Sequence, residues 1–90
     1  MNRTERTVQI VNRRGLHARA SAKFVKTASQ FDAHVTVTRD GQTVDAESIM
    51  GLMMLGAAMG DHITISAEGE HAANVVEAMV ALVEAKFGED

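Results

Sequence analysis

The sequence contains no cysteine and no proline. The lack of cysteine excludes disulfide bonds and thiolate metal sites, and the lack of proline means that no helix is kinked by a proline ring. Tryptophan and tyrosine are also absent, and the chain has three phenylalanines. So few aromatic side chains disfavour a domain that binds nucleic acid by stacking on the bases.

Long hydrophobic runs are missing as well. No apolar run has the length that a bilayer-spanning helix needs, and the N-terminal segment MNRTERTVQIV lacks the apolar core of a signal peptide. Together with the absence of disulfide chemistry, these features predict a cytoplasmic protein that does not bind a membrane.

The composition predicts one small domain, residues 1–90. Hydrophobic residues make up 46% of the chain and charged residues 23%, with a formal net charge of −3, which argues against general nucleic-acid binding. The basic residues cluster before position 27, whereas the last third is acidic. This asymmetry indicates either a local anionic target or only an unevenly charged surface. The early basic residues are Arg3, Arg6, Arg13, Arg14, Arg19, Lys23 and Lys26.

The first half of the chain begins with a predicted strand at residues 7–11, where polar and β-branched apolar residues alternate. A loop follows at residues 12–15. Residues 18–30 carry apolar side chains at helical spacing and predict an amphipathic helix with His17 at or near its cap. The predicted apolar stripe consists of Ala18, Ala22, Val25 and Ala28.

The middle of the chain predicts a hairpin at residues 33–46, turning at Asp40-Gly41. Ser48 is a suitable N-cap for a short helix. A last strand at residues 62–69 precedes a long helix at residues 70–87, whose predicted apolar stripe is Val75, Val76, Met79, Leu82, Val83 and Phe87. The order β-α-β-β-α-β-α predicts a sheet with one face covered by helices and the other open to solvent.

His17 differs in setting from the other histidines. His34 and His62 occupy polar positions of predicted strands and His71 opens the last helix, so surface roles are expected for them, and no histidine pair has the spacing of a helical zinc site. A neutral imidazole is nucleophilic, and the free amides of Ala18 and Arg19 can stabilise an anion at the helix start. The alternative is an ordinary surface histidine near a helix cap.

The short helix offers two further features with alternative interpretations. Ser48 is either a plain N-cap or a regulatory phosphorylation site, because a helix N-terminus tolerates added phosphate. The methionine-rich stretch that follows predicts core packing for most members, with Ile49 and Met53 as candidates for an adaptable contact patch. The stretch comprises Ile49, Met50, Met53, Met54 and Met59.

Three segments together, GLHARASAKFV, SIMGLMMLG and ITISAEGE, resemble the family of HPr, the histidine-containing phosphocarrier of the bacterial phosphoenolpyruvate-dependent phosphotransferase system. The resemblance extends from about residue 7 to residue 87. It implies an α+β fold, an open-faced β-sandwich with a four-stranded antiparallel sheet and three helices on one face.

The resemblance also implies a function. His17 would accept a phosphoryl group on Nδ1, the pros nitrogen, from phosphorylated enzyme I, which phosphoenolpyruvate charges, and would pass it to an enzyme IIA domain. Arg19 would steady the phosphoryl group, and an ATP-dependent serine kinase/phosphorylase would modify Ser48. The chain would then be a phosphorylated intermediate rather than an enzyme, a monomer without cofactor or metal. The implied partner surface consists of Arg19, Lys23, Lys26, Ile49 and Met53.

Two residues depart from the family pattern. Ala20 stands where proline is usual, and Glu47 stands where many members have lysine before the regulatory serine. The negative charge of Glu47 would repel a phosphate on Ser48. These departures keep open a nitrogen-branch (NPr-type) carrier with a regulatory output. A regulatory binding module that does not use His17 and a small nucleic-acid-binding domain are the remaining alternatives.

Overall fold

The computed structural model describes residues 2–89, which form one antiparallel sheet with strand order β1-β4-β2-β3. β1 pairs with β4, β4 with β2, and β2 with β3. The elements follow the order predicted from the sequence: β1 Arg3–Gln9, α1 Ala18–Ala28, β2 His34–Arg39, β3 Gln42–Asp45, α2 Ile49–Met54, β4 His62–Glu68, α3 Ala72–Glu84 and a final turn of 3₁₀ helix, η1 Lys86–Gly88.

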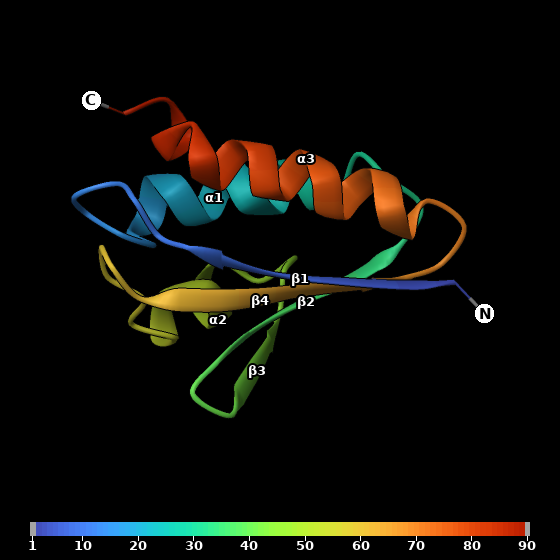
Figure 1. Cartoon of the computed structure of the whole chain (residues 1–90), viewed down its shortest axis with the longest axis horizontal. Coiled ribbons are helices and arrows are strands. Elements are labelled where there is room, and N and C mark those ends of the chain that lie inside the picture. Colours follow the sequence, from blue (N-terminus) through green and yellow to red (C-terminus); the bar gives the residue numbers. More distant parts are fainter. Residues whose placement is uncertain (1, 90) are drawn as a thin grey trace.

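The helices and the sheet form two layers (Figure 1). α1 and α3 lie side by side over one face of the sheet, and the shorter α2 contacts α1 and β3. The predicted α+β open-faced sandwich is therefore confirmed. Within residues 2–89, no helix combines the length and the apolar character needed to cross a membrane.

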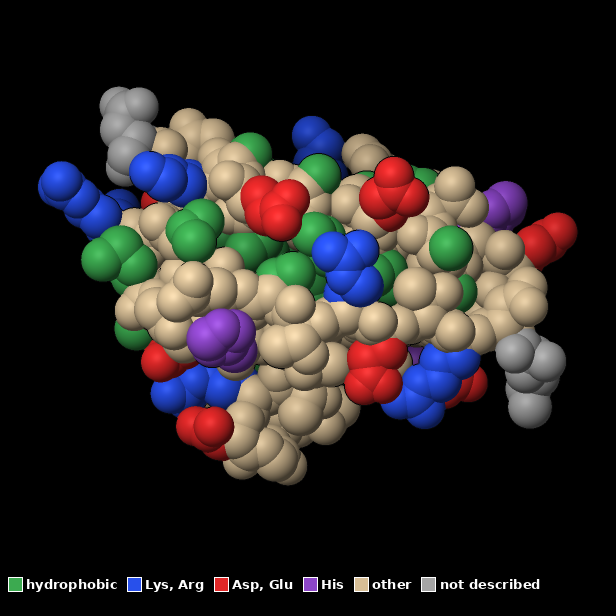
Figure 2. All heavy atoms as spheres, in the orientation of Figure 1, with side chains coloured by type: hydrophobic (Ala, Val, Ile, Leu, Met, Phe, Trp, Pro, Cys, Tyr) green, Lys and Arg blue, Asp and Glu red, His purple; other side chains and the backbone are tan. Residues whose placement is uncertain are grey.

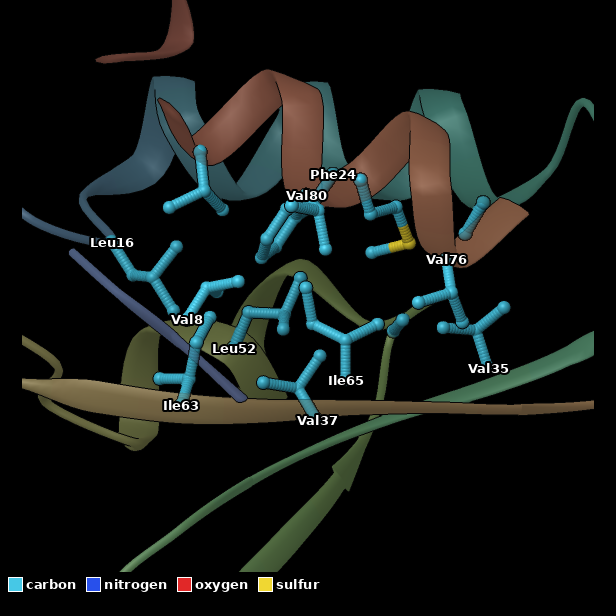
Figure 3. Packing of buried hydrophobic residues seen from close by; sticks show 14 of the residues in the cluster. Val8, Leu16, Phe24, Val35, Val37, Leu52, Ile63, Ile65, Val76 and Val80 are labelled. Atoms are coloured by element: carbon cyan, nitrogen blue, oxygen red, sulfur yellow. The ribbon is translucent and has the colours of Figure 1, made fainter. Parts of the chain in front are cut away.

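The core lies between the sheet and the helices (Figure 3). Val35, Val37, Ile63 and Ile65 alternate along β2 and β4 with more exposed residues, so every second side chain enters the core. The opposite face is polar and carries hydroxyl pairs such as Thr7 Oγ1 with Thr64 Oγ1 at 2.9 Å. Burying only one face of an antiparallel sheet produces this alternation.

The apolar stripe predicted for α1 is correct for Ala28, which is buried, and for Val25, which packs against the core, and wrong for Ala18 and Ala22, which are exposed. The helix also buries Ala20, Ser21 and Phe24. Phe24 is the largest apolar side chain of this helix, and its burial orients the helix so that the row at positions 20, 24 and 28 faces the core. Alanines carry too little surface to compete for that orientation.

The last helix is also shorter than predicted, because α3 ends at Glu84. Lys86 and Phe87 adopt left-handed conformations, with φ of 57° and 55°, so the chain turns away from the helix axis. Left-handed backbone costs about 1 kcal/mol or more for each non-glycine residue. The turn places Phe87 in the core, with its ring 5.2 Å from that of Phe24 in an edge-to-face arrangement, and burying such a side chain contributes about 1.5–3 kcal/mol.

Candidate functional site

The loop before α1 is held by Gly15, which docks against the segment that follows α2. Gly15 has φ +62°, and a Cβ at this position would lie 2.2 Å from the carbonyl oxygen of Ala57 and 2.9 Å from the Cα of Ala58. The backbone N–H of Leu16 donates to the same Ala57 oxygen at 3.0 Å. Only glycine allows the two backbones to approach this closely.

The docked loop carries His17 to the start of α1. Leu16 is buried in the core (Figure 3), and His17 is the N-cap residue, in extended conformation with φ −72° and ψ 179°. Its side chain does not cap the helix, and the first helical N–H that donates backward is that of Ser21, to the His17 carbonyl at 2.9 Å. The amides of Ala18, Arg19 and Ala20 therefore have no backbone partner within residues 2–89 and remain available for an anion.

A glutamate from the far end of the chain contacts the imidazole. The Nε2 atom of His17 and the Oε2 atom of Glu89 form a hydrogen bond, with 14% and 18% of the two side chains exposed. Because a carboxylate can only accept, the Nε2 atom carries the proton. Within the described chain, we find no hydrogen bond to Nδ1, the other ring nitrogen, and in the neutral imidazole with its proton on Nε2 this nitrogen keeps its lone pair.

Asn12 holds the other oxygen of that carboxylate. Its Nδ2 group donates to Oε1 of Glu89 at 3.1 Å and to the carbonyl of Gly15 at 2.9 Å. Asn12 is fully buried, and its Oδ1 atom lacks a hydrogen-bond partner in residues 2–89. The hydrogen bonds from Asn12 and His17 lower the pKa of Glu89 below its ordinary value, against a smaller opposing effect of burial.

Two contacts bring Glu89 into this position. Phe87 anchors the C-terminal segment under α1, and the Nζ group of Lys23 donates to the Phe87 carbonyl. The C-terminal segment is therefore tied to α1 at Lys23, less than two helical turns after His17. Lys23, predicted as a partner-binding residue, is half-buried and holds this internal contact.

The segment against which Gly15 packs is held in place by Arg39 of the β2–β3 hairpin. Arg39, at the end of β2, donates to the Leu55 carbonyl at 2.9 Å and lies 3.1 Å from Oδ2 of Asp61. The same Asp61 oxygen accepts the N–H of Ala58 at 2.9 Å. Arg39 and Asp61 thus fix the backbone on which the His17 loop rests.

The surface around His17 combines basic and apolar side chains. Arg19 and Lys26 are exposed, and Figure 2 shows basic and hydrophobic groups close together at the end of the molecule that carries the C-terminus. The methionine-rich stretch was predicted to lie mainly in the core, and this is wrong, because all five of its named residues are exposed. The exposed ones are Ile49 at 40%, Met50 at 70%, Met53 at 41%, Met54 at 70% and Met59 at 57%.

Ser48 caps α2 as predicted. Its Oγ accepts the N–H of Gly51 at 2.9 Å, and Leu52 is the residue of this helix that enters the core. Ile49 and Met53 lie on the face of this short helix that points away from the core, and both are exposed. Glu47 beside it is exposed.

The remaining histidines lie outside this arrangement. His34 and His62 are exposed on the sheet, as expected, and His71 is the N-cap of α3. A shallow hollow near His71 is lined by Phe31 and Asn74 among others, at the opposite end of α1 from His17. No group of three or more histidine or acidic side chains that could hold a metal ion occurs among residues 2–89.

Asn12 and Glu89 were not predicted from the sequence. Asn12 had a local signal, because asparagine is favoured at the start of turns and lies three residues before Gly15. Glu89 had none, since it reaches His17 across 72 positions of the chain and depends on the left-handed turn at Phe87.

The arrangement is that of a nucleophile carrier. The His17 imidazole is largely buried, its Nδ1 makes no hydrogen bond within residues 2–89, and it lies beside unpartnered helix amides and the exposed Arg19. The sequence profile described as the PTS HPr component phosphorylation site matches residues 4–85. The chain belongs to the HPr family of phosphocarrier proteins of the phosphotransferase system.

Individual relatives agree with this assignment. The chain is 44% identical to the phosphocarrier protein HPr of Cupriavidus necator over 85 residues, covering 94% of this chain and 96% of the relative. It is also 44% identical to the phosphocarrier protein NPr of Shewanella violacea over 89 residues, covering 99% and 98%. The crystal structure of HPr from Thermoanaerobacter tengcongensis superposes with a TM-score of 0.92 at 46% identity, covering 97% of this chain and 98% of that one.

Proposed function

We propose that this chain carries a phosphoryl group on Nδ1 of His17, accepting it from phosphorylated enzyme I and passing it to an enzyme IIA domain. The observation that carries the proposal is the N-cap imidazole, which leaves both its own Nδ1 and the first amides of α1 unused. Phosphohistidine and a place in the phosphotransferase system follow from membership of the family.

The chemistry needs little from the protein beyond position and charge. The Nδ1 lone pair attacks phosphorus, a new N–P bond forms, and the bond from phosphorus to the donor breaks in line with it. The amides of Ala18 and Arg19, at the positive end of the α1 dipole, stabilise the added negative charge, and the Arg19 guanidinium can add charge-assisted hydrogen bonds. Onward transfer is the same step in reverse, toward a different acceptor.

The proposed partner surface surrounds His17. Arg19 and Lys26 would meet an acidic partner, and the exposed Ile49 and Met53 would pack against apolar groups. Lys23 contributes less than the sequence suggested, because its ammonium is already bound to the Phe87 carbonyl. Such contacts fit brief encounters, and we propose that the chain works as a monomer in the cytoplasm, although a swapped dimer is described for the relative Crh of Bacillus subtilis.

Regulation and pathway are the second part of the proposal. Ser48 would be a regulatory phosphorylation site, and Glu47 beside it weakens that role by repelling phosphate. The same residue favours the nitrogen-branch alternative, and relatives named HPr and NPr match the chain equally well. Phosphoryl transfer to a sugar-specific enzyme IIA, compared with a nitrogen-branch enzyme IIA, distinguishes the two.

The decisive test is intact mass after incubation with enzyme I and phosphoenolpyruvate. The native chain should gain one acid-labile phosphoryl group, and His17→Ala should gain none. Uptake by His17→Ala, or no uptake by the native chain beside an enzyme I shown to be active, would refute the proposal and favour a regulatory binding module.

A further inference from the structure

The carboxylate of Glu89 is bound at both of its oxygens. Oε2 contacts Nε2 of His17, and Oε1 accepts from Nδ2 of Asn12 at 3.1 Å. Asn12 in turn is oriented by its second hydrogen bond, to the Gly15 carbonyl at 2.9 Å. The carboxylate is thus fixed relative to the loop that carries His17.

The segment that delivers Glu89 is equally well anchored. Phe87 is fully buried, its carbonyl accepts from Lys23, and the N–H of Glu89 donates to the Lys86 carbonyl at 2.9 Å. Lys86 and Phe87, the two left-handed residues before it, cost free energy. The contacts of Phe87 and Glu89 compensate this cost and stabilise the bend. Glu89 is the group that this bend places beside the imidazole.

We propose that Glu89 is a positioning residue for His17: its carboxylate keeps the proton on Nε2, leaves Nδ1 as the nucleophilic nitrogen, and stabilises the positive charge that the ring gains in phosphoryl transfer. The proposal rests on the proposed function, since it assigns Glu89 a part in that same transfer. A carboxylate that orients a histidine through its other ring nitrogen acts in this way in metal sites and in catalytic triads.

The balance of the step shows why the carboxylate matters. When Nδ1 forms its bond to phosphorus, the Nε2 proton stays in place and the ring becomes an imidazolium. Glu89 compensates that charge without taking the proton. When the N–P bond later breaks, the electron pair returns to Nδ1 and the ring is neutral again. Uptake creates this positive charge and donation removes it, so Glu89 should accelerate uptake and should not accelerate donation.

The expected effect is moderate. In buried triads, loss of the orienting carboxylate costs about 10⁴-fold in rate. Here both side chains keep some exposure, and solvent takes over part of the task. We therefore expect Glu89→Ala to slow phosphoryl uptake by about tenfold and not to slow phosphoryl donation.

The test measures the ring and the transfer separately. In ¹⁵N-labelled native protein near pH 7, the Nε2–H of His17 should give a one-bond NMR correlation, because the hydrogen bond protects it from exchange. Glu89→Ala should lose this correlation and show slower phosphoryl uptake. Glu89→Gln, which keeps an acceptor oxygen without the charge, should retain the correlation and slow uptake by about threefold. The matched control, Glu77→Gln on exposed α3 surface, should change neither.

The contrary results are distinct. A correlation that survives in Glu89→Ala or is missing in the native protein, or an uptake rate unchanged in Glu89→Ala, would overturn the role of Glu89. If a purely structural role were correct, Glu89→Ala would lose stability with unchanged transfer rates for its folded fraction. If the native chain takes up no phosphoryl group, the proposed function fails, while the correlation still reports whether Glu89 holds the ring.

Discussion

His17 and Ser48 each stand at the residue before a helix, yet they use their side chains in different ways. The Ser48 hydroxyl is engaged as a cap by the Gly51 N–H at 2.9 Å. The His17 ring does not cap α1 and is held instead from outside the helix by Glu89. At Ser48 the helix start is completed by its own residue, whereas at His17 it is left open.

The difference bears on the proposed function, because the helix start at Ser48 is capped by its own side chain and the one at His17 is not. A phosphoryl group on His17 would meet amides that have no competing side chain, next to Arg19. A phosphoryl group on Ser48 would replace an existing cap hydrogen bond and would lie beside the charge of Glu47. Membership of one family therefore does not make the two positions equivalent in this chain, and the following changes test the contrast.

The largest effect is expected where the His17 loop docks. Gly15→Ala would place a Cβ 2.2 Å from the Ala57 oxygen, and we expect a loss of about 3–4 kcal/mol in the free energy of unfolding. Gly56→Ala is the matched control, since Gly56 has a similar φ of +64° with no atom within 4 Å of the added Cβ, and should lose about 1 kcal/mol. Urea unfolding measures both, and equal losses would show that docking at Gly15 is unimportant.

Removal of the serine cap should have the next largest effect. Ser48→Ala loses the hydrogen bond from Gly51 and should destabilise the fold by about 1 kcal/mol. Ser48→Asn keeps a capping oxygen and should be nearly neutral. Neither should slow phosphoryl uptake at His17, as measured by intact mass over time; a slowed uptake in Ser48→Ala alone would mean that the two helix starts are coupled.

Reversal of the charge beside Ser48 should change stability less but modification more. Glu47→Lys places a positive charge near the N-terminus of α2 and should cost about 0.5 kcal/mol. Phosphorylation of Ser48 by an ATP-dependent HPr kinase should become faster, because the repulsion of phosphate is removed. Glu77→Lys makes the same change of net charge on α3 and serves as the control. Equal kinase rates for native protein and Glu47→Lys would refute the effect of Glu47.

The smallest effect concerns pH. The pKa of Glu89 is lowered in the folded state, so this carboxylate stabilises the fold above the ordinary glutamate pKa of about 4.3. That contribution is lost as the pH falls through the lowered folded pKa. Between pH 7 and pH 3 the native chain should therefore lose more unfolding free energy than Glu89→Gln. Parallel pH profiles for the two proteins would contradict the lowered pKa.

Local patterns predicted the elements well where the signal lies within a few residues. The alternation around Val35 and Val37, the turn at Asp40 and the cap at Ser48 are all confirmed. The stripe predicted for α1 was wrong at Ala18 and Ala22, because several alanines flank Phe24 and helical spacing alone did not choose among them. The prediction of core packing for the methionines was wrong for a related reason, because apolar character does not determine which face of a short helix packs against the rest of the domain.

The sequence by itself determined the order of strands and helices, the start of α1 at His17 and the family resemblance, because periodicity, caps and turns act between near neighbours in the chain. Only the tertiary structure decided how Gly15 docks on Ala57 and how Asn12 holds Glu89 against the imidazole. Those contacts join distant positions through close backbone approach and a left-handed bend at Phe87. Packing of the whole domain sets that geometry, so no local sequence pattern predicted it.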